Sequence, residues 1–120
     1  MSNKCVLIVE DESMLLLFAS MALEDEGYHV HVAANGREGL RIAREQKPDV
    51  IITDYMMPEM NGIVMIQTLR DEGVMVPCVV TTAIPRDQLP DNAESVINFY
   101  IGKPYNEPEL ASIVRTALAG

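Results

Sequence analysis

Val50-Ile51-Ile52-Thr53-Asp54 is a run of apolar, mostly β-branched residues that ends in a carboxylate, and turn-forming residues follow it from Tyr55 to Gly62. A continuous apolar run of this length predicts a strand that is buried on both faces, as in a parallel sheet. In open α/β sheets, ligands bind beyond the carboxyl ends of the strands, which is where Asp54 lies. Asp54 is therefore a candidate site residue, although on its own it fits a solvated strand end equally well.

Around this stretch, the composition is that of an ordinary soluble domain. The chain has 120 residues, of which 48% are hydrophobic and 22% are charged, so we expect residues 1–120 to form one domain with a substantial core. The net charge of −9 provides no basic surface for nucleic acid or anionic lipid, so we expect no direct nucleic-acid contact. Any influence on DNA would pass through another protein.

The cysteines and the start of the chain bear on its compartment. Cys5 and Cys78 each lie inside an apolar run, which predicts buried free thiols in a reducing compartment. The first residues lack the apolar region of a signal peptide, and the most apolar segment, Met14 to Leu23, is too short to span a bilayer. We therefore expect a cytoplasmic protein without membrane insertion.

Apolar runs alternate with helical patterns along the chain. The predicted strands are Cys5–Val9, Tyr28–Val32, Val50–Asp54, Val76–Val80 and Val96–Ile101. The predicted helices are Ser13–Glu26, Arg37–Gln46, a third after Asn61, and a last one after Asn106, whereas Pro85 and Pro90 predict a short or irregular fourth helix. Such alternation predicts an α/β, flavodoxin-like fold: a doubly wound, five-stranded parallel sheet in the order 2-1-3-4-5 with about five helices.

Local signals support these helices and mark one unusual feature. Gly27 is a helix terminator, Asn61 is a good N-cap, and Asn106 with Glu109 forms a capping-box pattern. The first helix is apolar over more than one face through Leu15-Leu16-Leu17-Phe18. Extra core packing is the preferred explanation of that face, and docking of a kinase or another partner is the alternative.

The predicted strand order brings several polar residues to one edge of the sheet. The carboxyl ends of strands 1, 3, 4 and 5 carry Glu10-Asp11, Asp54, Thr81-Thr82 and Lys103. Each has an ordinary explanation alone, as a helix cap, a turn hydroxyl or a surface lysine. Together they predict a cation site, because gathered carboxylates repel one another and Mg²⁺ prefers oxygen ligands. Asp54 is then a metal ligand only, or a nucleophile that accepts a phosphoryl group, with Lys103, Thr82 and the Ala83 amide around the phosphoryl oxygens.

These residues resemble the receiver domain of bacterial response regulators in two-component signalling. The resemblance spans nearly the whole chain and rests on residues 9–12, 53–62, 82–83 and 103–105. It implies that Asp54 accepts a phosphoryl group from the phosphohistidine of a sensor histidine kinase or a phosphotransfer protein. It implies Mg²⁺ on Asp11, Asp54 and the Met56 carbonyl, with Glu10 bound directly or through water.

The resemblance also implies a switch and a partner. Lys103 and Thr82 would contact the phosphoryl group, and Tyr100 would turn inward when Thr82 moves. A downstream protein target would then bind the face made by the fourth helix, the fifth strand and the fifth helix. We expect a monomer or weak homodimer, and the Lys103-Pro104 peptide is often cis in the family.

The chain departs from the family pattern in a few places. Glu10 stands where an aspartate is commoner, which bears on whether it touches the metal. Met56 and Ile84, two residues after Asp54 and Thr82, are both apolar. Our hypothesis is that they shield the acyl phosphate from water and slow its hydrolysis. The two prolines after Thr82 predict a short or mobile output face.

Three other functions fit parts of the pattern. A small aspartyl-phosphate phosphatase would need a second acid two residues after Asp54, where Met56 stands. A flavodoxin-like electron carrier would need a phosphate loop after the first strand, where Glu10-Asp11-Glu12 would repel phosphate. The main alternative is a phosphate-independent pseudo-receiver that acts as a binding module, against which the complete set of Asp11, Asp54, Thr82 and Lys103 argues.

Overall fold

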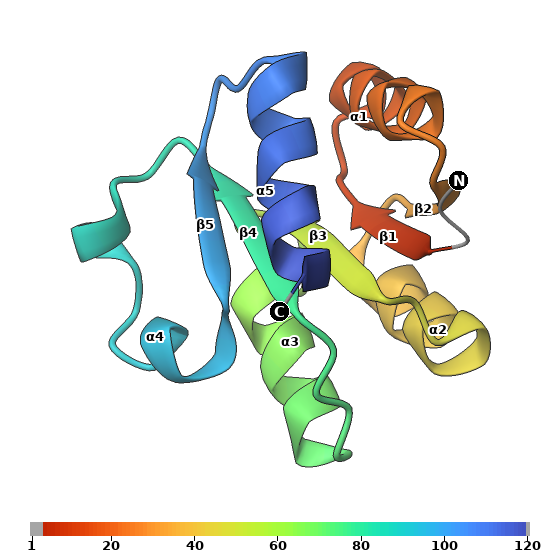
Figure 1. Cartoon of the computed structure of the whole chain (residues 1–120). Helices are drawn as coiled ribbons and strands as arrows, with labels where there is room; N and C mark the ends of the chain where they lie inside the picture. Colours follow the sequence, from red (N-terminus) through yellow and green to blue (C-terminus); the bar gives the residue numbers. More distant parts are fainter. Residues whose placement is uncertain (1–3, 120) are drawn as a thin grey trace.

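The computed structural model describes residues 4–119 as a five-stranded parallel sheet with helices on both faces (Figure 1). The strands are β1 (Cys5–Val9), β2 (His29–Ala33), β3 (Val50–Asp54), β4 (Cys78–Thr82) and β5 (Phe99–Gly102), in the order β2-β1-β3-β4-β5. The helices are α1 (Ser13–Asp25), α2 (Gly36–Gln46), α3 (Gly62–Asp71), α4 (Ala93–Val96) and α5 (Glu107–Ala119). This is the predicted fold class and strand order.

Two hydrophobic cores lie on opposite faces of the sheet. Helices α1 and α5 pack over one face, around Val6, Ile8 and Leu110, and helices α2 and α3 pack over the other, around Leu7 and Ile51 (Figure 1). All five residues of β3 are buried, which explains why the run from Val50 to Asp54 has no polar alternation until its end. The central strand is thereby held from both sides.

The predicted helix caps are present. Gly27 has φ +94° just after α1, a conformation that glycine adopts without strain. The Asn61 side chain accepts a hydrogen bond from the Val64 amide, 2.9 Å, at the start of α3. At the start of α5, the Glu109 amide donates to Asn106 Oδ1 and the Asn106 amide donates to Glu109 Oε1, which confirms the capping box.

The region between Thr82 and Phe99 differs in detail from its prediction. As the prolines indicated, it holds only a 3₁₀ turn, η1 (Arg86–Gln88), and the single-turn α4. The predicted start of the fifth strand at Val96 is wrong, because Val96 is buried in α4 and the strand begins at Phe99. A valine in a short apolar run fits a strand or a buried helical turn equally well, and here the packing against α3 decides.

Two smaller boundaries also move. Strand β4 begins at Cys78 and not at Val76, and it extends through Thr82. Strand β2 is shifted by one residue relative to its prediction, to His29–Ala33, and it is an edge strand as expected. Both cysteines carry free thiols; Cys78 is buried, which raises its pKa to about 11, and Cys5 is half-buried.

Part of the second apolar face of α1 is exposed, so its preferred explanation as extra core packing is wrong for Leu17 and Phe18. Met14, Leu17, Phe18 and Met21 are 71%, 52%, 39% and 56% exposed, at the i, i+3, i+4, i+7 spacing of one helix face. We call these four residues the α1 stripe. Leu16, by contrast, does pack against the core beneath α1. In the described part of the chain, no helix is both long and apolar enough to cross a membrane.

Candidate functional site

Strand register brings the predicted site residues together at one edge of the sheet. Val9 pairs with Thr53, Asp54 with Thr81, and Thr82 with Gly102. The four strands therefore end at nearly the same level along the sheet, and the residues at their carboxyl ends lie near one another. Glu10 directly follows β1, Asp54 closes β3, Thr82 closes β4, and Lys103 follows β5. Four separate segments of sequence therefore supply a single site, as their order predicted.

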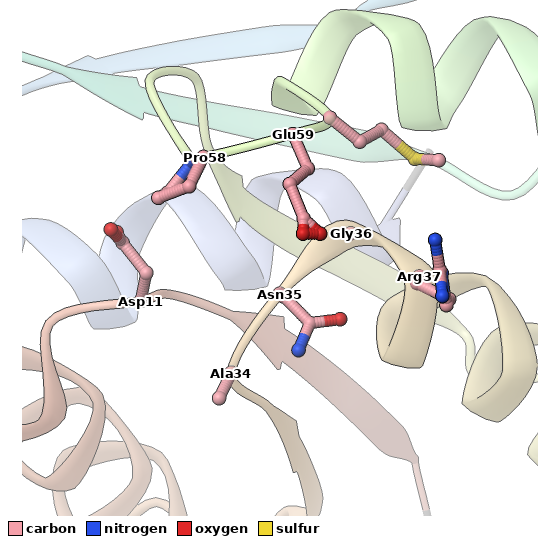
Figure 2. A pocket seen from close by; sticks show the side chains of 8 residues that line it. Asp11, Ala34, Asn35, Gly36, Arg37, Pro58 and Glu59 are labelled. Atoms are coloured by element: carbon pink, nitrogen blue, oxygen red, sulfur yellow. The ribbon is translucent and has the colours of Figure 1, made fainter.

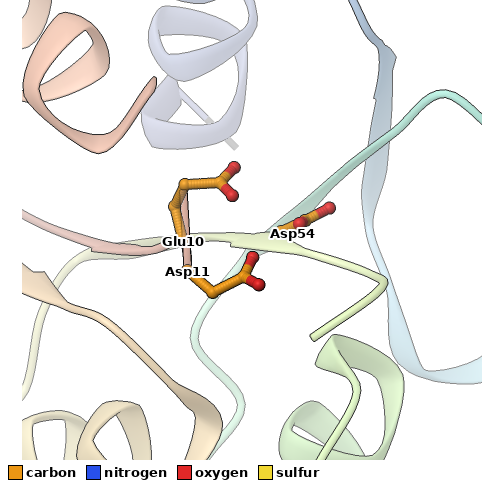
Figure 3. A group of neighbouring side chains, drawn as sticks. All are labelled: Glu10, Asp11 and Asp54. Atoms are coloured by element: carbon orange, nitrogen blue, oxygen red, sulfur yellow. The ribbon is translucent and has the colours of Figure 1, made fainter. Parts of the chain in front are cut away.

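Three carboxylates and one ammonium form the centre of this site. Carboxylate oxygens of Glu10, Asp11 and Asp54 all lie within 4.8 Å of one another, and the three side chains extend toward the same side (Figure 3). Lys103 Nζ lies 3.0 Å from Glu10 Oε1 and 3.2 Å from Asp54 Oδ1. Glu10 and Asp54 are only 4% and 6% exposed, whereas Asp11 is exposed and forms the solvent side of the cluster.

Burial dominates the electrostatics of the two inner acids. It raises the pKa of Glu10 above 4.5 and that of Asp54 above 3.8, and the nearby Lys103 only partly offsets this. For Lys103, burial favours the neutral amine, but the two carboxylates outweigh it and raise the pKa of the ammonium. Burial, Glu10 and Asp54 also raise the pKa of the neighbouring Tyr105 to about 12. The site therefore holds excess negative charge in a poorly solvated place.

The residues present fit a hard divalent cation. One ammonium among three carboxylates leaves two negative charges uncompensated, which matches the charge of Mg²⁺. An open hollow of about 380 Å³ adjoins Asp11, between the start of α2 and the segment around Pro58 and Glu59 (Figure 2). Of the three acids only Asp11 lines this hollow, so it would leave room for water ligands of Mg²⁺ on that side of the cluster.

The predicted switch residues are linked through one backbone position. The Ile84 amide donates a hydrogen bond to Thr82 Oγ1, 3.1 Å, and the Tyr100 hydroxyl donates to the Ile84 carbonyl, 2.7 Å. Thr82 is buried and Tyr100 is half-buried. Thr82 and Tyr100 are thus one residue apart in the hydrogen-bond network, although 18 positions separate them in the sequence.

One contact of the site was not foreseen from the sequence, and two features near it had been predicted. One carboxylate oxygen of Glu10 accepts from Lys103, and its other oxygen accepts from the Glu12 amide. The Met56 side chain is 59% exposed, and the position of its carbonyl on a metal stays a prediction. The Lys103-Pro104 peptide is cis, as the resemblance implied.

Comparison with known proteins identifies the class. The family model described as the response regulator receiver domain matches residues 6–115. The chain belongs to this family of regulatory phospho-acceptor domains of two-component signalling.

Among curated relatives, the chain is 34% identical over 116 residues to the probable transcriptional regulatory protein TcrX of Mycobacterium tuberculosis, covering 94% of this chain and 49% of TcrX. It is 34% identical over 119 residues to the alkaline phosphatase synthesis transcriptional regulatory protein PhoP of Bacillus subtilis, covering 97% of this chain and 49% of PhoP. The chain therefore spans about half the length of these relatives.

Solved structures agree in fold. The chemotaxis response regulator CheY4 of Vibrio cholerae superposes with a TM-score of 0.91 at 29% identity, covering 98% of this chain and 100% of CheY4. The receiver domain of the sensor histidine kinase PA1611 of Pseudomonas aeruginosa, described with a magnesium ion coordinated in its active-site cleft, gives 0.88 at 26% identity, covering 99% and 100%.

Proposed function

We propose that residues 1–120 act as one receiver unit that accepts a phosphoryl group on Asp54 from a phosphohistidine, in a reaction that requires Mg²⁺. The observation that carries this proposal is the buried Asp54, held 3.2 Å from Lys103 within a three-carboxylate cluster. A structural carboxylate would not need two further acids at the same strand ends, because their mutual repulsion costs stability.

The proposed step is a phosphoryl transfer. An Asp54 oxygen attacks phosphorus, the bond between phosphorus and the donor's imidazole nitrogen breaks, and an acyl phosphate and a free histidine result. When bound, Mg²⁺ would neutralise charge on the phosphoryl oxygens. Asp11 and Asp54 would hold the ion, with Glu10 and the Met56 carbonyl as further ligands, directly or through water.

Lys103 and Thr82 would stabilise the transferred group. Lys103 already lies beside Asp54 and Glu10, so its ammonium needs only a small movement to pair with a phosphoryl oxygen. The Thr82 hydroxyl accepts from the Ile84 amide, which leaves its own proton free for another phosphoryl oxygen. Because Ile84 also accepts from Tyr100, a movement of Thr82 would reach Tyr100 and the face formed by α4, β5 and α5.

The α1 stripe supports a docking site for the phosphodonor's helix. A cavity of about 310 Å³, lined by Glu12, Leu15, Ala83, Lys103, Pro104 and Tyr105, lies between α1 and Lys103. The Phe18 and Tyr105 rings, with centroids 6.2 Å apart, connect the stripe to that cavity. Apolar surface thus runs from α1 up to the phosphoryl site, which suits a helix that presents its histidine to Asp54.

Incubation with acetyl phosphate and Mg²⁺, followed by intact mass measurement, tests the proposed acceptor. We expect one phosphoryl adduct in the wild type, none in Asp54→Asn, and an unchanged adduct in Asp71→Asn, which makes the same chemical change on the exposed end of α3. Chelation of Mg²⁺ should abolish the adduct. A wild type without any adduct would favour the phosphate-independent pseudo-receiver.

The apolar positions beside the site offer a test of the phosphate's lifetime. Met56 is exposed and Ile84 is half-buried. If these side chains keep water from the acyl phosphate, Met56→Asn and Ile84→Glu should each shorten its lifetime severalfold, measured as decay of the adduct after removal of acetyl phosphate. An unchanged lifetime in both variants would refute the shielding hypothesis.

A further inference from the structure

A chain of contacts extends the Thr82–Ile84–Tyr100 link to the surface of the molecule. Arg86, in η1, donates through Nε and Nη2 to both carboxylate oxygens of Glu94 in α4, at 3.0 and 3.1 Å. The same guanidinium carbon lies 5.9 Å from the centre of the Tyr100 ring, within cation–π range. Arg86 therefore joins η1, α4 and β5 around the residue that the proposed switch depends on.

We propose that Arg86 is a positioning residue for Tyr100. Paired with Glu94, it holds Tyr100 against Ile84 and thereby makes the switch sensitive to ionic strength. We call the Arg86–Glu94 pair, together with the contact of Arg86 on Tyr100, the Arg86 latch. Its effect on phosphorylation rests on the proposed function, whereas its effect on Tyr100 does not.

The Arg86 latch is the weaker of two sets of contacts that attach η1 and α4 to the rest of the fold. At the other end of α4, Arg70 donates five hydrogen bonds to the Val74, Val76 and Val96 carbonyls and to Asn98 Oδ1, and the Asn98 oxygen also accepts from the Cys78 amide. All but the Arg70–Asn98 bond are partly buried, and all involve neutral acceptors, so salt has little effect on them. The Arg86 and Glu94 side chains are 49% and 66% exposed, so salt screens their attraction.

The direction of the effect follows from the hydrogen bonds. The latched arrangement has Tyr100 on the Ile84 carbonyl and the Ile84 amide on Thr82, which leaves the Thr82 proton to donate. In this arrangement the Thr82 proton is not held by another acceptor and is available to a phosphoryl oxygen on Asp54 once Thr82 moves toward it. Loss of the latch should therefore lower the population that is ready for phosphorylation, by about two- to fivefold for a surface ion pair and an exposed cation–π contact.

The first arm of the test uses the unphosphorylated protein. Selective ¹³C labelling of tyrosine reports the Tyr100 ring by NMR in wild type, Arg86→Met, Arg86→Lys and the control Arg41→Met, whose exposed ion pairs lie on α2. We expect raised salt, up to about 1 M, where the Debye length is about 3 Å, to shift the wild-type Tyr100 signals toward those of Arg86→Met. Arg86→Met itself should not respond to salt, and Arg86→Lys, which lacks the bidentate fork, should lie between.

The second arm measures the rate of adduct formation with acetyl phosphate and Mg²⁺. Arg86→Met should react about two- to fivefold more slowly than wild type and Arg41→Met. Tyr100 signals that are identical in wild type, Arg86→Met and Arg41→Met at every salt concentration would overturn the latch. A changed Tyr100 with an unchanged rate would overturn its link to Thr82. If the wild type forms no adduct, the proposed function fails, and the first arm alone decides whether the latch exists.

Discussion

Strands β3 and β4 lie side by side and each ends in a site residue, yet the segments that follow them differ. After Asp54, the chain makes a short turn and enters α3, a regular helix of ten residues whose first turn Asn61 caps. After Thr82, it makes a 3₁₀ turn and a single helical turn, and Asn92 at the start of α4 makes no side-chain cap. Both segments bury residues in the core, but the first leads into a full, capped helix, whereas the second forms only short helical turns that the Arg70 and Arg86 contacts also attach.

The backbone after Asp54 and the backbone after Thr82 therefore differ in how firmly the surrounding structure holds them. Backbone that carries the acceptor is fixed by close packing, as an aligned phosphoryl transfer requires. The backbone that would respond to phosphorylation buries Ala93 and Val96, but it forms only short helical turns, and its exposed Arg86–Glu94 contact can be exchanged at low cost. A population shift needs such a segment, because tightly packed cores do not deform continuously.

Gly62→Ala should give the largest loss of stability, because it introduces a clash into the closely packed backbone around Asp54. A Cβ at Gly62 would lie 2.2 Å from the Asp54 carbonyl oxygen and 3.0 Å from two Thr53 side-chain atoms, and that backbone cannot move without distorting the site. We expect a loss of about 3 kcal/mol in the free energy of unfolding, measured by urea denaturation. Gly102→Ala, where the nearest atom is 3.7 Å away, is the control. Similar losses in both variants would show that the close approach at Gly62 is unimportant.

Arg70→Met should give the next largest loss of stability, because it removes the hydrogen bonds that attach the end of α4 to α3. The variant removes the Arg70 donors from the partly buried Val74 and Val96 carbonyls and leaves Val76 with only the Cys78 thiol, so we expect a loss of about 2 kcal/mol in the free energy of unfolding. Amide exchange should increase most at residues 93–98. Arg44→Met, which removes an exposed pair with Glu72, is the matched control and should change little. An increase in amide exchange that is the same throughout the sheet would contradict a role of Arg70 confined to residues 93–98.

Asp54→Asn should stabilise the metal-free protein at neutral pH. Burial raises the pKa values of Asp54 and Glu10, so the folded state retains protons that the unfolded chain releases. The stability due to these protons is present below their ordinary pKa values of 3.8 and 4.5 and is lost as the pH rises through the folded values. We expect the thermal midpoint of the variant at pH 7 to be about 4 °C above that of the wild type. As the pH rises, the midpoint of the variant should fall less steeply than that of the wild type.

Mg²⁺ provides the complementary measurement. The ion should raise the thermal midpoint of the wild type in a concentration-dependent way, because it binds the folded state only. Asp54→Asn should respond less. A wild type whose midpoint is insensitive to Mg²⁺ would contradict the assignment of the three-carboxylate cluster as a cation site.

Asn61→Ala should give the smallest loss of stability, and it tests whether α3 and α4 differ in their dependence on an N-cap. Loss of the hydrogen bond to the Val64 amide should cost about 1 kcal/mol, whereas Asn92→Ala should cost nothing measurable in the same unfolding experiment. Equal costs would mean that α4 depends on its N-terminal residue as α3 does.

Much of the site was predictable because parallel strands place their ends together. The order of the strands brings Glu10, Asp54, Thr82 and Lys103 to one edge of the sheet whatever the details of packing. The residue types and their places at the strand ends were therefore enough to predict that these side chains gather there. The start of β5 was not predictable in the same way. Val96 suits a strand or a buried helical turn, and its contact with α3 decided between them.

Local sequence patterns were enough to predict the alternation of strands and helices, the caps at Asn61 and Asn106, the irregular segment after Thr82, and the residues of the acidic edge. These depend on local propensity, on period and on chain order, which are properties of neighbouring residues. Only the tertiary structure decided that the α1 stripe is exposed, that Glu10 pairs with Lys103, and that Arg70 and Arg86 attach α4 at its two ends. Such contacts join residues far apart in the chain, and nothing in the local pattern of an arginine or a leucine states which partner it will meet.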